Sequence, residues 1–317
     1  MSLYPCTMAV VGKRILVTGG AGFIGSHSVA CLQDAGHEVL VLDDLSTGHR
    51  TNLPDDRVLT VGDIRDAALL DALLPGVNGI LHLAALVSVP RSIEAPRESL
   101  SRNVEGTLSV LEGARRHEVD RVVIASSAAV YGAATPPIAE HLPIAPLSPY
   151  GLEKATCEAY ARLYGELHGL ETVCLRYFNV YGPRQDPASP YSGVLSILAD
   201  RARSGRPFTI HGNGLQTRDF VHAADVAEAN LKALVTPGIA GLVANIGTGR
   251  QTSVAAMAHL VRKLLPSAPA PEHGPVRSGD IPDSWAATEA ARACLGWQAQ
   301  IPLEAGLEDL LMRSRAA

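Results

Sequence analysis

The stretch Arg14–Gly25, which reads RILVTGGAGFIG, decides the fold of this chain. Its first half is an apolar run typical of a buried strand, and its second half carries Gly19, Gly22 and Gly25 ahead of a helical pattern. Gly19 permits a tight turn, Gly22 lets backbone amides approach a pyrophosphate, and Gly25 allows a helix to pack closely on a strand. The stretch therefore predicts a strand, a turn and a helix that bind a dinucleotide.

Similar apolar runs alternate with helical patterns through the first half of the chain. Predicted strands cover Arg14–Gly20, Glu38–Asp44, Gly79–Ala85, Arg121–Ser127 and Thr172–Phe178. Predicted helices cover Gly22–Gly36, Arg65–Leu74, Glu98–His117 and Pro149–His168. The runs are continuously apolar, as expected of parallel strands that are covered on both faces. The pattern predicts an α/β fold with a doubly wound parallel Rossmann sheet.

The character of the sequence changes after Asn179. We predict a functional loop, a helix, a short strand and a turn at Gly182–Pro190, Gly193–Ser204, Phe208–His211 and Gly212–Gly214. A helix at Val226–Leu234 and a strand at Leu242–Ile246 can rejoin the first sheet, and a helical tail from Ser253 is interrupted at Pro266–Pro275. These patterns predict an NAD-binding domain (1–178 with 221–248) and a smaller, mostly helical substrate domain (179–220 and 249–317).

The composition argues against several functional classes. Of 317 residues, 47% are hydrophobic and 19% charged, so the chain folds around a core rather than staying disordered. Aromatic residues make up 4% and the net charge is −5, which argues against a nucleic-acid partner. No C-x-x-C pair occurs, so we predict no metal site and reduced thiols at Cys6, Cys31, Cys157, Cys174 and Cys294.

The sequence also carries no recognisable targeting signal. The first residues lack the charged segment and the cleavage site of a signal peptide, and no apolar run reaches the roughly 18 residues of a membrane span. We expect a cytoplasmic protein with no membrane partner.

Two acidic residues, Asp43 and Asp44, end the second predicted strand. A carboxylate at this place accepts hydrogen bonds from the adenosine ribose of a dinucleotide and repels a 2′-phosphate. No arginine directly follows Gly20 or Asp44, so the sequence predicts NAD rather than NADP. Asp63, after a further predicted strand, either accepts a hydrogen bond from the adenine amino group or is a solvated turn residue.

Tyr150 and Lys154 form a Y-x-x-x-K pair at the start of a predicted helix, where the i, i+4 spacing places both on one face. A phenol with its ordinary pKa near 10 is a poor base at neutral pH, and a nearby ammonium group lowers that pKa. Ser127 ends a predicted parallel strand, where such sheets bind ligands. Its hydroxyl can orient a substrate hydroxyl, or it can be a turn or capping residue.

Together, the glycine turn, Asp43, Ser127 and the Tyr150/Lys154 pair resemble the extended short-chain dehydrogenase/reductase family. Six further stretches resemble its nucleotide-sugar branch, and most closely the UDP-hexose 4-epimerases. They are SSAAVYG (126–132), SPYGLEK (148–154), RYFNVYGPRQDP (176–187), TRDFVH (217–222), NIGTG (245–249) and RSGDI (277–281).

The resemblance implies roles for many residues. Ser127 and Tyr150 would handle the sugar 4-hydroxyl. NAD would be lined by Phe23, Ile24, Asp43, Asp44, Leu45, Ser46, Thr47, Gly48, Asp63, Ile64, Leu83, Ala84, Ala85, Val87, Asn103, Tyr150, Lys154 and Phe178. UDP would be held by Asn179, Val194, Leu195, Thr209, Ile210, His211, Arg218, Arg277 and Asp280. The two arginines have the fork geometry that suits a diphosphate, or they form surface salt bridges.

Two departures from the family narrow the expected chemistry. Related 4,6-dehydratases carry an Asp-Glu pair where this chain has Ala128 and Ala129, so dehydration is not expected and decarboxylation of a uronic acid is disfavoured. Some epimerases place a bulky Tyr where this chain has Ser284. A small residue there would leave room for an N-acetylated hexose, unless Ser284 only caps the start of a helix at Trp285.

We therefore expect epimerisation of a UDP-hexose at carbon 4 through a 4-keto intermediate, with NAD as cofactor. The alternatives are a reductase of a 4-keto nucleotide sugar and a non-catalytic dinucleotide sensor, which would not need Tyr150 or Lys154. Family members are often dimers through the helices predicted at Glu98–His117 and Pro149–His168. Apolar stripes on these helices would equally suit packing against their own sheet.

Overall fold

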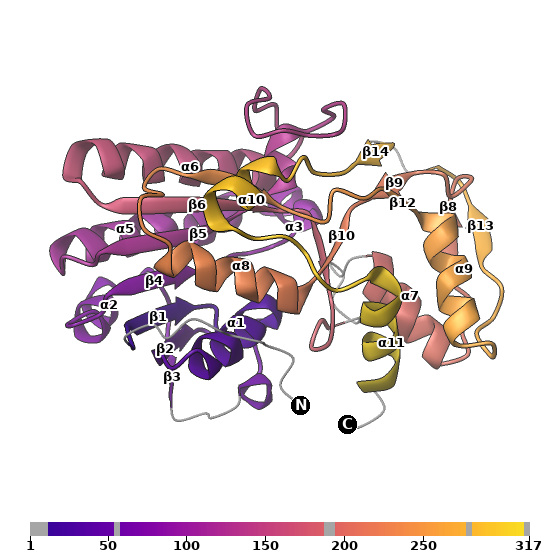
Figure 1. Ribbon diagram of the computed structural model, residues 1–317, viewed down its shortest axis with the longest axis horizontal. Coiled ribbons are helices and arrows are strands. Elements are labelled where there is room, and N and C mark those ends of the chain that lie inside the picture. Colours follow the sequence, from indigo (N-terminus) through magenta and orange to yellow (C-terminus); the bar gives the residue numbers. More distant parts are fainter. Residues whose placement is uncertain (1–11, 54–57, 187–193, 277–280, 314–317) are drawn as a thin grey trace.

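The computed structural model describes residues 12–53, 58–186, 194–276 and 281–313. Within them, seven parallel strands form one sheet in the order β3-β2-β1-β4-β5-β6-β11 (Figure 1). Their bounds are β1 Arg14–Thr18, β2 Glu38–Asp43, β3 Leu59–Val61, β4 Gly79–His82, β5 Arg121–Ser127, β6 Glu171–Tyr177 and β11 Val243–Ile246. The chain moves outward from β1 in both directions, which confirms the predicted doubly wound sheet.

Helices cover both faces of this sheet because side chains alternate along each strand. Ile15 and Val17 of β1 belong to a core with α1 (Phe23–Asp34), α8 (Ala223–Val235) and α10 (Glu289–Leu295). Leu16 belongs to a second core with α2 (Ala67–Leu73), α5 (Gly106–Arg116) and α6 (Pro149–His168). Burial on both faces explains why the strands are continuously apolar.

One predicted helix is not a single regular helix. The segment predicted at Glu98–His117 begins in α4 (Pro96–Leu100), passes through a π-helical turn at Ser101–Glu105 and continues as α5. A short helix, α3 (Val89–Glu94), precedes it. The wider turn carries Asn103, whose side chain is bonded to the loop after β4. Tertiary bonding at Asn103 therefore accompanies a local geometry that apolar periodicity does not reveal.

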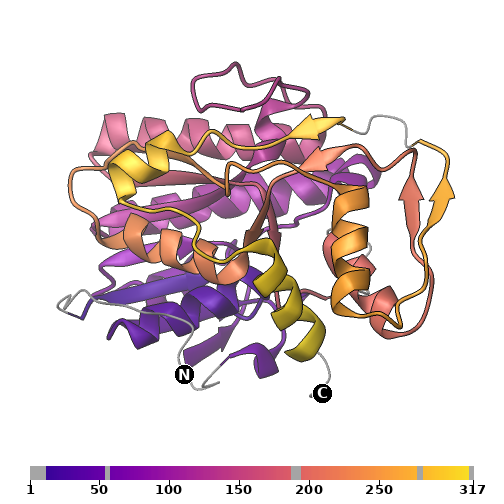
Figure 2. The same cartoon turned by 45° about the vertical axis from the view of Figure 1, so that its right-hand side comes forward.

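A smaller lobe lies beside the carboxyl end of the sheet (Figures 1 and 2). It contains α7 (Val194–Arg203), α9 (Val254–Leu264), α11 (Leu303–Arg313) and a parallel pair of strands, β8 (Thr209–His211) and β13 (Glu272–Gly274). Its apolar side chains form a separate core that includes Leu198, Phe208 and Met257. The exact division of the chain into two domains stays a prediction.

Several short strands were not predicted. β13 lies inside the predicted interruption Pro266–Pro275, where pairing with β8 orders the backbone. β7 (Asn179–Tyr181) pairs with β10 (Phe220–His222), and β9 (Thr217–Arg218) pairs with β12 (Thr252–Ser253) and β14 (Asp283–Ser284). Strands of two or three residues are too short to show a periodic pattern. No helix begins at Ser284, so its interpretation as a helix cap is wrong.

The described part of the chain contains no helix long and apolar enough to cross a membrane. Among its cysteines, Cys31, Cys157 and Cys174 are buried free thiols and Cys294 is exposed.

Candidate active site

The glycine turn between β1 and α1 has the geometry that its sequence predicts. Gly19 has φ of +71°, and a Cβ there would lie 2.7 Å from the amide nitrogen of Ala84. A Cβ on Gly25 would collide with the carbonyl oxygen of Gly19. Gly22 caps α1 without a side-chain hydrogen bond, and the first amides of a helix have no intrahelical acceptor. The turn therefore presents backbone donors to an anion, which fits the pyrophosphate of a dinucleotide.

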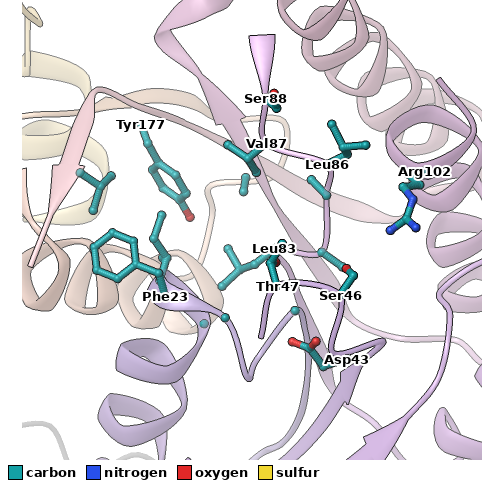
Figure 3. Close-up of a pocket in the computed structure, with 18 of the residues that line it drawn as sticks. Phe23, Asp43, Ser46, Thr47, Leu83, Leu86, Val87, Ser88, Arg102 and Tyr177 are labelled. Atoms are coloured by element: carbon teal, nitrogen blue, oxygen red, sulfur yellow. The ribbon is translucent and has the colours of Figure 1, made fainter. Parts of the chain in front are cut away.

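A cleft of about 780 Å³ opens above this turn at the carboxyl ends of β1, β2, β4 and β5. In Figure 3, Phe23 and Tyr177 lie at one end of it, and Asp43, Ser46 and Thr47 lie at the other. Most residues predicted to line NAD do line the cleft: Gly19, Gly22, Phe23, Ile24, Gly25, Asp43, Asp44, Ser46, Thr47, Asp63, Ile64, Leu83, Ala84, Ala85, Val87, Tyr150, Lys154 and Phe178. Its volume and the glycine turn among its lining fit a dinucleotide.

Tyr150 and Lys154 lie together on the buried side of α6, and both line the cleft. The Lys154 ammonium nitrogen is 5.9 Å from the centre of the Tyr150 ring and donates a 2.8 Å hydrogen bond to the carbonyl of Ala125. The amide of Tyr150 donates to Ser92 Oγ, which fixes the start of the helix. Ser127 lines the same cleft from the end of β5, so the three predicted catalytic residues all line one cleft.

The two adjacent aspartates at the end of β2 have different surroundings. Asp43 is buried and accepts hydrogen bonds from the amides of Ala21 and Leu45 at 2.9 and 2.8 Å. Burial raises the pKa of Asp43, and the two amide donors oppose that rise. Asp44 is exposed and pairs with Arg102. Asp43 thus holds the glycine turn and the following loop, in addition to facing the cleft.

Asp63 also lines the cleft, and its contacts are those of a partly exposed turn residue. Its carboxylate accepts hydrogen bonds from the amide and the guanidinium of Arg65, which lower the pKa of Asp63. Contact with an adenine ring stays a prediction.

Asn103 does not line the cleft but holds one of its walls in place. Its Oδ1 accepts from the amide of Leu86 at 2.7 Å, and its Nδ2 donates to the carbonyl of Leu86 and to Glu153. Glu153 lies between Tyr150 and Lys154 in the sequence. Its side chain is buried and also accepts a hydrogen bond from Ser99. Asn103 therefore couples the helix that carries Tyr150 to the loop after β4.

His82, at the end of β4, is fully buried beneath this wall. Thr107 donates to the carbonyl of Asn103, so its hydroxyl oxygen accepts from His82 Nε2, and His82 Nδ1 accepts from Thr18. This arrangement needs the neutral ring with its proton on Nε2. Burial, together with the nearby charge of Lys154, lowers the pKa of His82 to about 3.

This buried histidine predicts a pH-dependent stability. Between pH of about 6.5 and 3 the unfolded chain binds a proton at His82 that the folded chain does not, so stability falls as the pH falls. From pH 7 to pH 5 this group should remove about 2 kcal/mol of unfolding free energy. Urea denaturation at both pH values should show that the unfolding free energy of His82→Gln falls by about 2 kcal/mol less than that of the wild type. Equal losses in both proteins would contradict the assignment.

The structure does not bring every predicted residue to this cleft. Leu45, Gly48 and Asn103 do not line it, although a Cβ on Gly48 would lie 2.8 Å from the Asp43 carboxylate. Of the residues predicted for UDP and the sugar, Ser127, Tyr150 and Asn179 line it. The smaller lobe carries Leu195, Thr209, Ile210, His211, Arg218 and Ser284, and Val194 begins α7. Arg277 and Asp280 lie outside the described residues.

Two of these lobe residues are neighbours across a pair of strands. Arg218 of β9 is opposite Ser284 of β14 in the register. Arg218 also donates to the carbonyl of Thr217 at 2.8 Å.

Sequence reasoning missed other residues that line the cleft. Arg102 comes from the π-helical turn, and no sequence signal points to it. Tyr177, Arg184, Gln185 and Asp186 belong to the stretch RYFNVYGPRQDP, where no role was assigned to them. The other missed residues are Leu42, His49, Gly62, Ser88, Ala125, Ser126 and Val180.

Much of the family-like sequence forms buried polar contacts around the cleft. Asp219 of TRDFVH is fully buried and accepts from Thr248 and Gly249 of NIGTG and from the amide of Ala286. Burial raises the pKa of Asp219, opposed by these donors. The conspicuous motif residues therefore include structural links as well as groups that face the cleft.

The sheet, the glycine turn and the Tyr150/Lys154 pair define a dinucleotide-dependent enzyme of the short-chain dehydrogenase/reductase type. The model of the NAD dependent epimerase/dehydratase family matches residues 15–247. The chain belongs to this family, and it is an NAD-dependent epimerase, an isomerase.

Named relatives match nearly the whole chain. A putative UDP-glucose 4-epimerase of Methanocaldococcus jannaschii is 40% identical over 300 residues, with 94% of this chain and 97% of the relative covered. The crystal structure of UDP-glucose 4-epimerase from Thermotoga maritima with UDP-glucose has a TM-score of 0.91 at 36% identity, covering 96% and 99% of the chains. UDP-N-acetylglucosamine 4-epimerase from Methanobrevibacter ruminantium has a TM-score of 0.91 at 33% identity, covering 95% and 98%.

Proposed function

We propose that this protein interconverts the carbon-4 epimers of a UDP-hexose, with UDP-glucose and UDP-galactose as the first pair to test. The observation that carries the proposal is that Ser127, Tyr150 and Lys154 line the same cleft as the glycine turn. The similarity to UDP-glucose 4-epimerases over nearly the whole chain supports the choice of substrate.

The side chains divide the chemistry between them. NAD, when bound, supplies a reversible acceptor and donor of hydride for carbon 4 of the sugar. Tyr150 removes the proton of the 4-hydroxyl and later returns it, while Lys154 favours the phenolate form of the tyrosine. Ser127 donates a hydrogen bond to the oxygen at carbon 4 and so steadies the 4-keto intermediate.

The 4-keto hexose has to rotate within the site so that its opposite face receives the hydride. Binding energy therefore belongs on the nucleotide rather than on the hexose. Asn179 lines the cleft, and Arg218 belongs to β9. We assign these residues, with Arg277 and Asp280, to UDP.

The direct test incubates the purified protein with a panel of UDP-hexoses and separates the 4-epimers by chromatography. We expect UDP-glucose and UDP-galactose to approach one equilibrium ratio from either side, without added NADH. Net consumption of NADH, with a 4-keto nucleotide sugar as the substrate, would instead identify a reductase. No turnover of any UDP-hexose would overturn the proposal.

Replacing Lys154 by Ala tests the division of roles. The variant should need a higher pH to reach half of its maximal rate, because the phenol loses the cation that favours its ionised form. Initial rates across pH 6 to 10 measure the shift, and Lys232→Ala, on α8, serves as a control for the loss of a lysine. An unchanged pH profile in Lys154→Ala would remove the lysine from the mechanism.

We further propose that N-acetylated hexoses are accepted. Ser284 is a small residue opposite Arg218 in the smaller lobe, and one structural neighbour is a UDP-N-acetylglucosamine 4-epimerase. Ser284→Tyr should lower kcat/KM for UDP-N-acetylglucosamine by at least about tenfold through a steric clash while changing that for UDP-glucose little. Parallel kinetics with both substrates measure this, and an equal effect on both would refute the assignment of Ser284.

A homodimer through α6 is also proposed. Leu152, Leu163 and Leu167 are exposed by 58, 38 and 70% and recur on one stripe of this helix, because 11 and 15 residues are close to whole numbers of turns. The opposite face of α6, with Ala161 and Tyr164, packs against the protein's own core. A second copy would cover the exposed leucines.

Light scattering, which measures molar mass, distinguishes the monomer from the dimer. We expect the wild type at twice 33.3 kDa and the Leu163→Glu/Leu167→Glu variant at the single mass. Met312→Glu, an exposed position on α11, is the matched control and should stay dimeric. A monomeric wild type would end the proposal.

A further inference from the structure

An ion pair between Asp44 and Arg102 lies at the end of the cleft that Asp43 and Asp44 line, which we call the acidic end. The guanidinium of Arg102, in the π-helical turn before α5, lies 3.2 Å from Asp44 Oδ2 at the end of β2. Its Nε lies 3.5 Å from a carboxylate oxygen of Glu98. Asp44 Oδ1 accepts from the amide and the hydroxyl of Ser46. Arg102, Asp44 and Ser46 all line the cleft beside Asp43, and Figure 3 shows the Arg102 side chain near this end.

Asp43 and Asp44 therefore have different structural roles. Each carboxylate oxygen of Asp43 accepts one backbone amide, from Ala21 or from Leu45, so Asp43 stabilises the turn as well as facing the cleft. Asp44 is partly exposed, and its second oxygen is engaged by a guanidinium that the sequence places far from β2. Removing the charge of Asp44 changes what Arg102 can bind without dismantling the turn.

We propose that the Asp44–Arg102 pair determines the selectivity of this protein for NAD⁺ over NADP⁺. Asp44 accepts from one Nη of Arg102, and a 2′-phosphate entering this end meets the carboxylates of Asp43 and Asp44. With Asp44 neutralised, Arg102 becomes a donor for that phosphate. The inference rests on the proposed function, in which the adenosine end of the dinucleotide lies at Asp43 and Asp44.

The charges of Asp44 and Arg102 affect the binding of a 2′-phosphate in opposite directions. A phosphate monoester carries between one and two negative charges near neutral pH, and a guanidinium can bind two of its oxygens at once. Asp44 and Arg102 are 35 and 32% exposed, so salt screens their attraction and the pair can exchange partners. Asp43 remains in place in every variant below, so a gain for NADP⁺ rather than a complete reversal of selectivity is expected.

The test measures which dinucleotide the full-length protein holds at equilibrium, without an activity assay. Protein is incubated with equal concentrations of NAD⁺ and NADP⁺, filtered, and the bound nucleotides are separated by chromatography. Asp44→Asn preserves the acceptor for Ser46 and removes the charge. Its bound NADP⁺-to-NAD⁺ ratio should rise by about tenfold to a hundredfold over the wild type, the size expected of hydrogen bonds to a charged group.

A second variant separates attraction by Arg102 from simple relief of repulsion. In Asp44→Asn/Arg102→Gln the gain should fall back toward the wild-type ratio, because the phosphate has lost its donor. If the double variant gains as much as the single variant, repulsion by Asp44 alone sets the selectivity and the proposal is wrong. It is equally wrong if Asp44→Asn shows no gain.

Displacement by ADP distinguishes failure of this inference from failure of the underlying placement. ADP should compete with the bound dinucleotide in the wild type and in both variants. If ADP does not compete, the adenosine end lies elsewhere and the placement falls together with the inference. If ADP competes while the ratios stay unchanged, only the role of the Asp44–Arg102 pair is refuted.

Discussion

The Tyr150→Phe variant is expected to lose epimerase activity by about a thousandfold, the typical contribution of a positioned acid–base group. The phenolic hydroxyl is the only part removed, and the ring continues to pack on the buried side of α6 near the Lys154 ammonium. The backbone bond from Tyr150 to Ser92 does not involve the side chain and persists. Chromatographic separation of UDP-glucose and UDP-galactose after timed incubation gives the rate.

Cofactor binding provides the control for this variant. NAD should remain associated with Tyr150→Phe, because the glycine turn and Asp43 are untouched. The bound nucleotide is quantified after the protein is precipitated, and the urea midpoint checks that the fold is intact. Activity within a few-fold of the wild type would remove Tyr150 from the mechanism, whereas loss of NAD together with activity would assign it to binding.

The largest effect on stability is expected at Arg176. This residue of β6 is buried and makes two hydrogen bonds to the carboxylate of Glu158, at 2.9 and 2.6 Å. It also donates to Tyr131 and to the carbonyl of Glu140, and Ser126 donates to Oε1 of Glu158. Arg176→Met keeps much of the volume but leaves the Glu158 charge buried without its cation. Unfolding in urea should show a loss of about 3–5 kcal/mol.

A paired substitution separates the buried charge from the lost packing. Arg176→Met/Glu158→Gln removes both charges and keeps an acceptor for Ser126, so it should be more stable than Arg176→Met by about 2 kcal/mol or more. The double-mutant cycle, measured as unfolding free energies, gives the coupling between the two residues. A double variant that is less stable than Arg176→Met would show that the charge of Glu158 is not the source of the damage.

Sequence patterns predicted the sheet, the glycine turn and the Tyr150/Lys154 pair, whereas most other residues that line the cleft were predicted from the family resemblance. The apolar runs that became β1, β2, β4, β5, β6 and β11 are long enough to reveal burial on both faces, and the glycine pattern identifies the turn at the start of α1. The pair Tyr150 and Lys154 was predicted from spacing within one helix. Such signals are local, because strand alternation, glycine φ angles and helical spacing all act over a few residues.

Other features depend on contacts between distant segments. The π-helical turn at Ser101–Glu105 accompanies the bonds of Asn103 to Leu86 and Glu153, which come from two other elements. A strand as short as β13 depends on its partner, because its three residues are ordered by pairing with β8. Arg102 reaches Asp44 across 58 residues, so a search for arginines adjacent to Asp44 could not find it.

By itself, the sequence determined which backbone segments are strands and helices, where a dinucleotide can approach the chain, and which tyrosine and lysine share a helical face. Only the tertiary structure decided which charges meet. It placed Arg102 on Asp44, buried Arg176 against Glu158, and held His82 neutral between two threonines. Local patterns report the conformational preferences of short segments, whereas pairing and burial of charge depend on the chain path that brings remote residues within a few ångströms.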